Sequence, residues 1–239
     1  IIQIGMPDVI TRRELFNGYL KKVSHAVTPE EVEDLVNDTQ GLSHAHISSA
    51  IEKDAIRIAI FDGRDKITRA DIEHGVEERL LGLANPIENW EPEQRESVAY
   101  HEAGHLIAAH ILRPRKRIAR TSIIRRARSL GYMMDVETKE IYGRPMADFA
   151  ADIMVSLAGH VAVRIKYGEE WTGASMDFQN VRQLMYHMAG LAQFGRQIPF
   201  KLEDPFASED IKKAADKYLQ RAIDGTERVL RQNWEKVEA

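Results

Sequence analysis

Apolar positions in the first third of the chain recur at the three- and four-residue spacing of amphipathic helices. Polar caps begin these segments. Thr28-Pro29-Glu30-Glu31 combines an N-cap threonine, a proline in the first turn and the glutamate of a capping box. Thr68-Arg69-Ala70-Asp71 begins a later helix in a similar way. Between them lies an apolar stripe of Ile47, Ile51, Ala55, Ile58 and Ala59. Residues 7–83 are therefore predicted to form a small all-helical domain.

The pattern changes at a polar stretch that contains two prolines. Residues 85–92 are predicted to be a linker. A long helix is predicted from about Pro92 to Leu112, because Arg113-Pro114 then stops it. Apolar and β-branched residues at 118–124 and again at 130–136 predict two short strands around a basic turn.

Three more amphipathic helices are predicted towards the C-terminus. They are Met146–Tyr167, a helix that begins near Ser175, and a last helix capped by Ser208. The chain as a whole is predicted to be mainly α-helical. Residues 1–84 would hold the end of one module and its helical domain, and 93–239 a mostly helical domain with a small β element.

Composition narrows the classes of function. The net charge of −4 argues against a nucleic-acid-binding surface as the main function. Because the chain has no cysteine, a metal would need His, Asp or Glu ligands. No uninterrupted run reaches the roughly 20 apolar residues of a membrane-spanning helix. The chain begins at Ile1 without an initiator methionine, so we expect further residues, including any membrane anchor, beyond its ends.

One motif carries a specific chemistry: His101-Glu102-Ala103-Gly104-His105, within the long predicted helix. Residues four apart lie on one face of a helix, so His101 and His105 can both present an imidazole nitrogen to one ion. Glu102 lies beside the first ligand, where its carboxylate can reach a metal-bound water without binding the metal. Zinc lowers the pKa of such a water to about 7, and the glutamate then acts as general base in peptide hydrolysis. The motif therefore predicts a zincin-type peptidase site.

The residue pattern leaves the third zinc ligand open. Catalytic zinc takes three protein ligands and keeps one position for water. His110 is a poor candidate, because it lies about 180° around the helix from the metal-facing side. We expect His160 and His187, on other predicted helices, to be ordinary core or surface residues. Three acids near the end of one predicted helix and the start of the next suit the role: Glu169, Glu170 and Asp177. Acids at helix starts also compensate the helix dipole, so spacing does not separate these three.

Several motifs in order along the chain resemble one family. They are Tyr100-His101-Glu102-Ala103-Gly104-His105, Ser129-Leu130-Gly131-Tyr132, Leu157-Ala158-Gly159 and Thr172-Gly173-Ala174-Ser175-Met176-Asp177. Together they resemble the peptidase domain of FtsH-type ATP-dependent zinc metalloproteases. Upstream, three segments are similar to the helical lid of that family's AAA+ ATPase module: Pro7-Asp8, Thr39-Gln40-Gly41-Leu42-Ser43 and Ile67-Thr68-Arg69-Ala70-Asp71-Ile72-Glu73.

This resemblance implies a fold and a set of roles. The fold is a small all-helical AAA+ lid followed by a zincin-type peptidase domain. Asp177 is implied as the third zinc ligand. The strand residues implied to pair with an extended substrate are Leu130, Gly131, Tyr132 and Met133. Strand addition tolerates many sequences because the main chain supplies most of the hydrogen bonds.

The resemblance also implies partners and a location. It implies a homo- or hetero-hexamer that degrades unfolded or membrane-associated proteins. A membrane anchor would precede the chain, and the proteolytic part would lie in a reducing soluble compartment, either the bacterial cytoplasm or an organelle.

The sequence departs from the family pattern at several positions. It contains no Gly-x-x-x-x-Gly-Lys-Ser/Thr phosphate loop, so ATP and Mg²⁺ are expected at an upstream module. His44-Ala45-His46 replaces a usual Gly-Ala-Asp run, Val163 and Arg164 replace paired acids, and Met176 stands where Asn is usual. These departures motivate an alternative, namely a catalytically idle scaffold or chaperone subunit of a mixed AAA+ ring.

Overall fold

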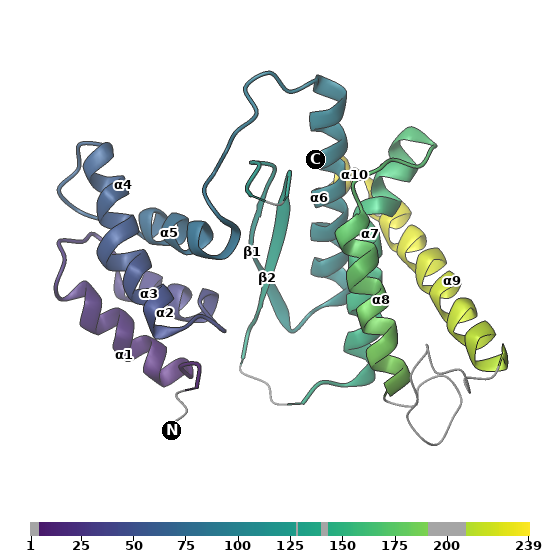
Figure 1. The fold of residues 1–239 in the computed structure, drawn as a ribbon, viewed down its shortest axis with the longest axis horizontal. Helices are drawn as coiled ribbons and strands as arrows, with labels where there is room; N and C mark the ends of the chain where they lie inside the picture. Colours follow the sequence, from purple (N-terminus) through teal and green to yellow (C-terminus); the bar gives the residue numbers. More distant parts are fainter. Residues whose placement is uncertain (1–4, 128, 140–142, 191–208) are drawn as a thin grey trace. The chain divides into compact units, whose positions relative to one another are not determined.

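The computed structural model describes residues 5–127, 129–139, 143–190 and 209–239 (Figure 1). It divides into two compact units. The first unit holds the described residues up to Glu88 together with the segments Ile124–Leu130 and Val136–Glu140. The second holds Asn89–Ile123, Gly131–Asp135 and the rest of the chain. The described residues are mainly helical and contain one two-stranded sheet, as predicted from the sequence.

The first unit consists of short helices begun by side-chain caps. They are α1 (Val9–Leu20), α2 (Pro29–Asp38), α3 (His44–Ser49), a π-helical segment (Ala50–Ala55), α4 (Ile56–Phe61) and α5 (Arg69–Leu81). Both predicted caps form reciprocal boxes, in which Thr28 pairs with Glu31 and Thr68 with Asp71. The fully buried side chains at the centre of the unit include Phe16, Leu35, Ile47, Ile51 and Ile72.

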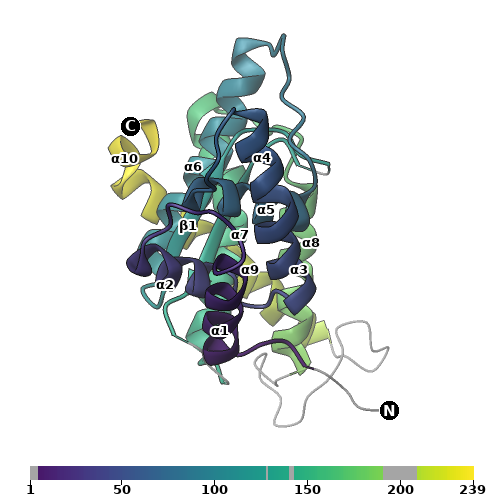
Figure 2. The same cartoon turned by 90° about the vertical axis from the view of Figure 1, so that its left-hand side faces the viewer.

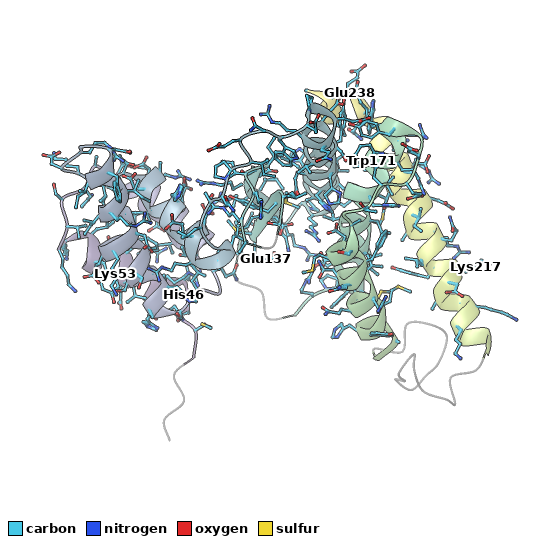
Figure 3. The ribbon with its side chains drawn as sticks, turned by 45° about the horizontal axis from the view of Figure 1, so that its top comes forward. His46, Lys53, Glu137, Trp171, Lys217 and Glu238 are labelled. Carbon is cyan, nitrogen blue, oxygen red and sulfur yellow. The ribbon has the colours of Figure 1, made fainter. Side chains whose placement is uncertain are left out.

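The π-helical segment makes α3 and α4 one continuous helix. Along this continuous helix, four buried apolar residues lie four positions apart: Ile47, Ile51, Ala55 and Ala59. A repeat of four is longer than the 3.6 residues of an α-helical turn, so the stripe would drift around a regular helix. A π-helical turn takes more residues, which keeps all four positions on the core side. The polar side of this helix carries His46 and Lys53, both exposed (Figure 3).

The segment Ile124–Leu130, which includes the predicted basic turn, belongs to the first unit. Arg126 is 3% exposed, pairs with Glu77 of α5 and donates to the carbonyl of Gly82 at 2.8 Å. Gly82 has a positive φ of 87°, and a Cβ there would stand 3.0 Å from the Cβ of Ala127, so glycine lets the turn approach the end of α5. The buried Arg126 attaches the turn to α5.

The second unit is built around α7 (Met146–Tyr167). It packs against α6 (Pro92–Leu112), α8 (Ser175–Gly190) and α9 (Glu209–Gln232), and α10 (Trp234–Glu238) packs on α6 (Figures 1 and 2). The core lies among these helices and includes Ile107, Ile153, Leu157, Val161 and Leu230. On α9 the buried positions face this core, whereas Lys217 points away from it (Figure 3).

Two strands form the small sheet. β1 (Lys116–Ser122) packs on α6, and β2 (Tyr132–Glu137) pairs with β1. The predicted strand bounds are shifted by about two residues, because the local apolar pattern does not specify where pairing starts. Among the described residues the sheet has only these two strands, so each strand has one edge without a strand partner.

Helix α7 is long and apolar enough to cross a membrane by length and composition alone, although charged residues interrupt its apolar sequence. In its most apolar window 56% of the residues are buried inside the protein, as in the core helix of a globular domain. The predicted cap at Ser208 lies outside the described residues.

Candidate metal centre

The two histidines of the helical motif converge on one point. α6 starts with Pro92 in its first turn and runs unbroken to Leu112, so His101 and His105 lie one turn apart on the same face. Their Nε2 atoms are 3.1 Å apart, and their side chains are 19% and 10% exposed. The rings meet edge to face with centroids 4.7 Å apart. The pair thus offers two imidazole nitrogens to one small volume.

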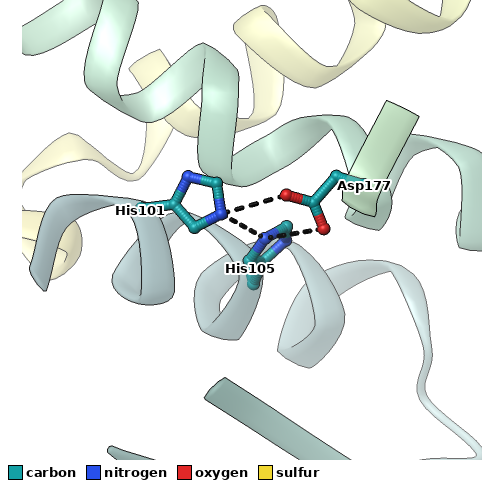
Figure 4. Close-up of side chains that lie close together, drawn as sticks. All are labelled: His101, His105 and Asp177. Atoms are coloured by element: carbon teal, nitrogen blue, oxygen red, sulfur yellow. Dashed lines mark hydrogen bonds and ion pairs between the residues drawn. The ribbon is translucent and has the colours of Figure 1, made fainter. Parts of the chain in front are cut away.

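Asp177 enters the same volume from the first turn of α8 (Figure 4). Its Oδ2 is 3.0 Å from Nε2 of His101, and its Oδ1 is 3.5 Å from Nε2 of His105. The three ligand atoms lie within 4.8 Å of one another. Within the described part of the chain, no other group of three His, Asp or Glu residues meets this condition.

These distances fit a tetrahedral zinc ion. Ligands at about 2.0–2.1 Å from tetrahedral zinc are about 3.3 Å apart, close to the spacings between these donor atoms. The Nδ1 of His105 lies 2.7 Å from the carbonyl of Val155, which is the hydrogen bond that a metal-binding histidine makes with its second nitrogen. With zinc bound, Nδ1–H would donate to this carbonyl, which would leave the lone pair of Nε2 for the metal. A set of two histidines and one carboxylate suits catalytic zinc.

Two glycines let α7 approach the ligands. A Cβ on Gly104 would stand 2.5 Å from the carbonyl oxygen of Ala158, so the small residue of the motif admits the backbone of α7. A Cβ on Gly159 would stand 2.5 Å from Nε2 of His105 and 2.6 Å from Cε1 of His101. Gly159 therefore leaves the space in which both imidazoles lie. The sequence signal for this role was a pair of small residues, Ala158-Gly159, within a helix of larger apolar residues.

The charges of the group support one another. Burial by itself would raise the pKa of Asp177, but hydrogen bonds from His101 and His105 outweigh it and hold that pKa well below its usual value. Burial opposes the charging of His105, yet the hydrogen bond and charge of Asp177 raise its pKa overall. Asp177 thus stays ionised across the physiological range, as a metal-binding carboxylate must.

Glu102 lies next to the group but outside it. Glu102 is only 8% exposed. This burial raises the pKa of its carboxyl group to about 7; the charge of His105 opposes the shift, and the charge of Asp177 adds to it. A carboxyl group with a pKa near neutrality can both take and return a proton. A Cβ on Gly131 would stand 2.8 Å from Oε1 of Glu102, so the chain just before β2 runs directly against this carboxyl group.

The other candidate ligands lie elsewhere. Glu170 pairs with His160 at 2.6 Å and its side chain is 63% exposed, while His187 stacks on Phe149. The two remaining candidates, His110 and Glu169, are exposed. Of the three acids that spacing left open, the structure brings Asp177 to the two motif histidines.

The four residues predicted to bind substrate are consecutive, and the boundary between the two units falls after the first of them. Gly131, Tyr132 and Met133 belong to the second unit, with Gly131 against Glu102 and Met133 against the core of that unit. Leu130 is counted with the first unit and is 45% exposed. Their contact with a substrate stays a prediction.

Comparison with known proteins assigns the family. Residues 88–238 match peptidase family M41, which is well over half of the chain. The chain belongs to peptidase family M41. This match includes the two histidines, Glu102 and Asp177, so the candidate metal centre lies within the family's domain.

The similar proteins carry consistent names. The ATP-dependent zinc metalloprotease FtsH 2 of Thermoanaerobacter sp. (strain X514) is 26% identical over 241 residues, 99% of this chain and 46% of the relative. The ATP-dependent zinc metalloprotease FtsH of Thermus thermophilus is 28% identical over 100% of this chain and 38% of its own length. The mouse mitochondrial inner membrane m-AAA protease component AFG3L2 is 30% identical over 96% of this chain and 29% of its own length. The M41 chain thus spans less than half the length of these relatives.

Proposed function

We propose that this chain is the peptidase part of a zinc-dependent endopeptidase. The observation that carries the proposal is the convergence of His101, His105 and Asp177 within 4.8 Å, with Glu102 beside them. Membership of peptidase family M41 and the zinc metalloprotease names of the relatives support the same reading. In this proposal His101, His105 and Asp177 hold the zinc ion, and Glu102 does not bind it.

The protein groups divide the reaction between them. Bound zinc would supply a Lewis acid that makes water nucleophilic near neutral pH. Glu102 accepts the proton of the attacking water at its carboxylate and can return it to the nitrogen of the leaving amine. Val155 and Gly159 keep the imidazole of His105 in place, and β2 offers a backbone edge along which an extended substrate can lie.

The wider activity is proposed from the relatives. Two of them are named ATP-dependent, and we propose that ATP and Mg²⁺ act at a module outside these 239 residues. The first unit would be the AAA+ lid next to that module. Unfolded or membrane-associated protein substrates, a homo- or hetero-hexameric ring and a membrane anchor outside this chain complete the proposal, with the proteolytic part in a reducing soluble compartment.

The decisive experiment compares Glu102→Gln with the unaltered protein. We expect about one zinc per chain in both, by metal analysis, because Glu102 is not a ligand. Cleavage of a labelled unfolded protein should fall by about 10²–10⁴-fold in the variant, as expected when a general base is lost. Glu96→Gln is the matched control, because Glu96 lies on the same helix with its side chain 49% exposed.

Two outcomes would overturn the proposal. A folded chain that holds no zinc would favour the idle scaffold suggested by the departures at His44, His46, Val163, Arg164 and Met176. Cleavage that survives Glu102→Gln unchanged would remove Glu102 from the mechanism.

A further inference from the structure

A cluster of ion pairs lies where β2 meets the ends of two helices. We define the Arg113 cluster as Arg113, Lys116, Arg144, Asp135 and Asp152. One nitrogen of Arg113, Nη1, pairs with Asp135, and another, Nε, lies 2.8 Å from Oδ1 of Asp152. Lys116 lies 3.2 Å from the other oxygen of Asp135, and Arg144 lies 2.6 Å from the other oxygen of Asp152. Each acid is thus held between two cations.

The centre of the Arg113 cluster is largely buried. The side chains of Arg113, Asp135 and Asp152 are 14%, 10% and 10% exposed. The free energy needed to remove such charges from water is about as large as the free energy gained from their attraction. Apolar residues at these positions would therefore stabilise the fold equally well. What the charges supply is direction, because a planar guanidinium donates along its N–H bonds, as Nη1 of Arg113 does to Asp135. Nε of Arg113 forms an ion pair with Oδ1 of Asp152 but no hydrogen bond. The cluster therefore favours one position of the elements that it joins.

Those elements surround the candidate metal centre. Arg113 directly follows α6, the helix of His101 and His105, and Asp152 lies on α7. Asp135 lies on β2, on the same face of the strand as Met133, which packs against the core of the second unit. One guanidinium thus connects the helix of the two histidines, the helix that lies against them and the strand.

The segment before Asp135 touches α6 at its other end. Gly131 lies against Glu102, and Asp135 pairs with Arg113. The four-residue step from Gly131 to Asp135 spans about 13 Å in a strand, and the eleven-residue step from Glu102 to Arg113 spans about 16 Å in a helix. The two lengths are similar, so this segment can be attached to α6 near both of its ends, while β1 packs on the helix. The residues in between, Tyr132 to Met134, are held by these two contacts and by the pairing of β2 with β1.

We propose that Arg113 is a positioning residue for peptide hydrolysis, which fixes the Asp135 end of the segment Gly131–Asp135 to the end of α6 so that a substrate on β2 reaches Glu102 in register. This inference rests on the proposed function and adds a residue outside the metal-binding motif. Arg113 touches neither the ligands nor the substrate in this proposal. Its loss should loosen β2 and weaken the binding of extended substrates, while the zinc site stays intact.

The test uses two variants that remove opposite sides of one ion pair, Arg113→Gln and Asp135→Asn. The matched control is Arg115→Gln, because Arg115 lies two residues further on, its side chain is 53% exposed and it pairs with Asp148. Hydrogen exchange of the β2 amides, zinc content, and kcat and KM for a labelled unfolded protein are measured for each. Arg113→Lys tests rescue, since lysine keeps the charge but satisfies one acid rather than two.

We expect β2 to exchange several-fold faster in both test variants and KM to rise by about 10-fold, with a smaller change in kcat and one zinc per chain. In Arg113→Lys the rise in KM should be smaller than in Arg113→Gln. Arg115→Gln should have the KM, kcat and β2 exchange of the unaltered protein. Unchanged exchange in β2, an unchanged KM, or loss of zinc in both variants would overturn the proposal. If the unaltered protein holds no zinc and cleaves nothing, the proposed function fails, and exchange in β2 still decides whether Arg113 holds the strand.

Discussion

Gly159 on α7 lies directly against His105 on α6, so that a single added Cβ would stand 2.5 Å from Nε2 of the imidazole. Real side chains do not tolerate such a contact, and Nε2 is the atom that would bind zinc. The packing of the two central helices and the geometry of the candidate metal centre therefore depend on the same glycine.

Gly159→Ala should weaken zinc binding by about 10–100-fold, the range for losing outer support of a metal ligand. The cause would be displacement of His101 and His105, because alanine is by itself the better helix former by about 1 kcal/mol. Competition with a chelator measures the affinity. Gly18→Ala in α1, with no atom within 4 Å of its Cβ position, should leave it unchanged. Equal zinc affinity in Gly159→Ala would show that the imidazoles have room to move.

Asp177→Asn should also weaken zinc binding, by at least the roughly 10–100-fold seen for outer partners, because a neutral amide replaces a charged ligand. Glu170→Gln is the control, since Glu170 pairs with His160 and is mostly exposed. Metal analysis after dialysis against zinc-free buffer separates the two variants. The opposite order, with zinc lost in Glu170→Gln and kept in Asp177→Asn, would mean that Glu170 is the third ligand.

Gly131→Ala should reduce cleavage without removing zinc. The new Cβ would stand 2.8 Å from Oε1 of Glu102 and 2.9 Å from the carbonyl oxygen of Ser122, so the base or the strand has to shift. A displacement of about 1 Å can cost about 10²-fold in rate. Steady-state cleavage of a labelled unfolded protein, with zinc content alongside, provides the measurement. Gly143→Ala, which meets no atom within 4 Å, is the control, and an equal loss of rate in both would count against a specific contact.

Asp71→Asn should destabilise the first unit at neutral pH. Hydrogen bonds from Arg64, and then from Thr68, lower the pKa of Asp71 from 3.8 to about 2 despite its burial. The folded carboxylate therefore stabilises the fold above pH 3.8, and this contribution is lost as the pH falls towards 2. Removing it should lower the free energy of unfolding by about 2 kcal/mol at pH 7 and by progressively less below about pH 4.

Denaturant unfolding followed by circular dichroism at pH 7 and at pH 3 measures this difference. Asp65→Asn, at an exposed position in the preceding loop, should change stability little at either pH. A destabilisation by Asp71→Asn that is the same at both pH values would show that packing or capping, rather than the charge, is what Asp71 supplies.

Local patterns in the sequence were sufficient for much of the fold. The caps at Thr28 and Thr68 form as predicted, and α7 has the predicted bounds, Met146–Tyr167, with Gly168 in the left-handed conformation (φ 74°) after it. These features depend on hydrogen bonds and packing preferences within one or two turns, which the order of residues specifies directly. The π-helical segment was not predicted, because it results from the packing of a whole stripe against the core.

For the candidate site, the sequence by itself determined the pair His101 and His105 with Glu102 between them, since helix geometry alone places residues four apart on one face. Spacing could not choose among Glu169, Glu170 and Asp177, because the chain between two helices can fold in many ways. The family resemblance implied Asp177, and the tertiary structure shows that Asp177 meets the histidines, that Gly159 makes room for them and that Arg113 pairs with Asp135 of β2. Those relationships join residues 22 to 76 positions apart in the sequence, and packing alone brings them together.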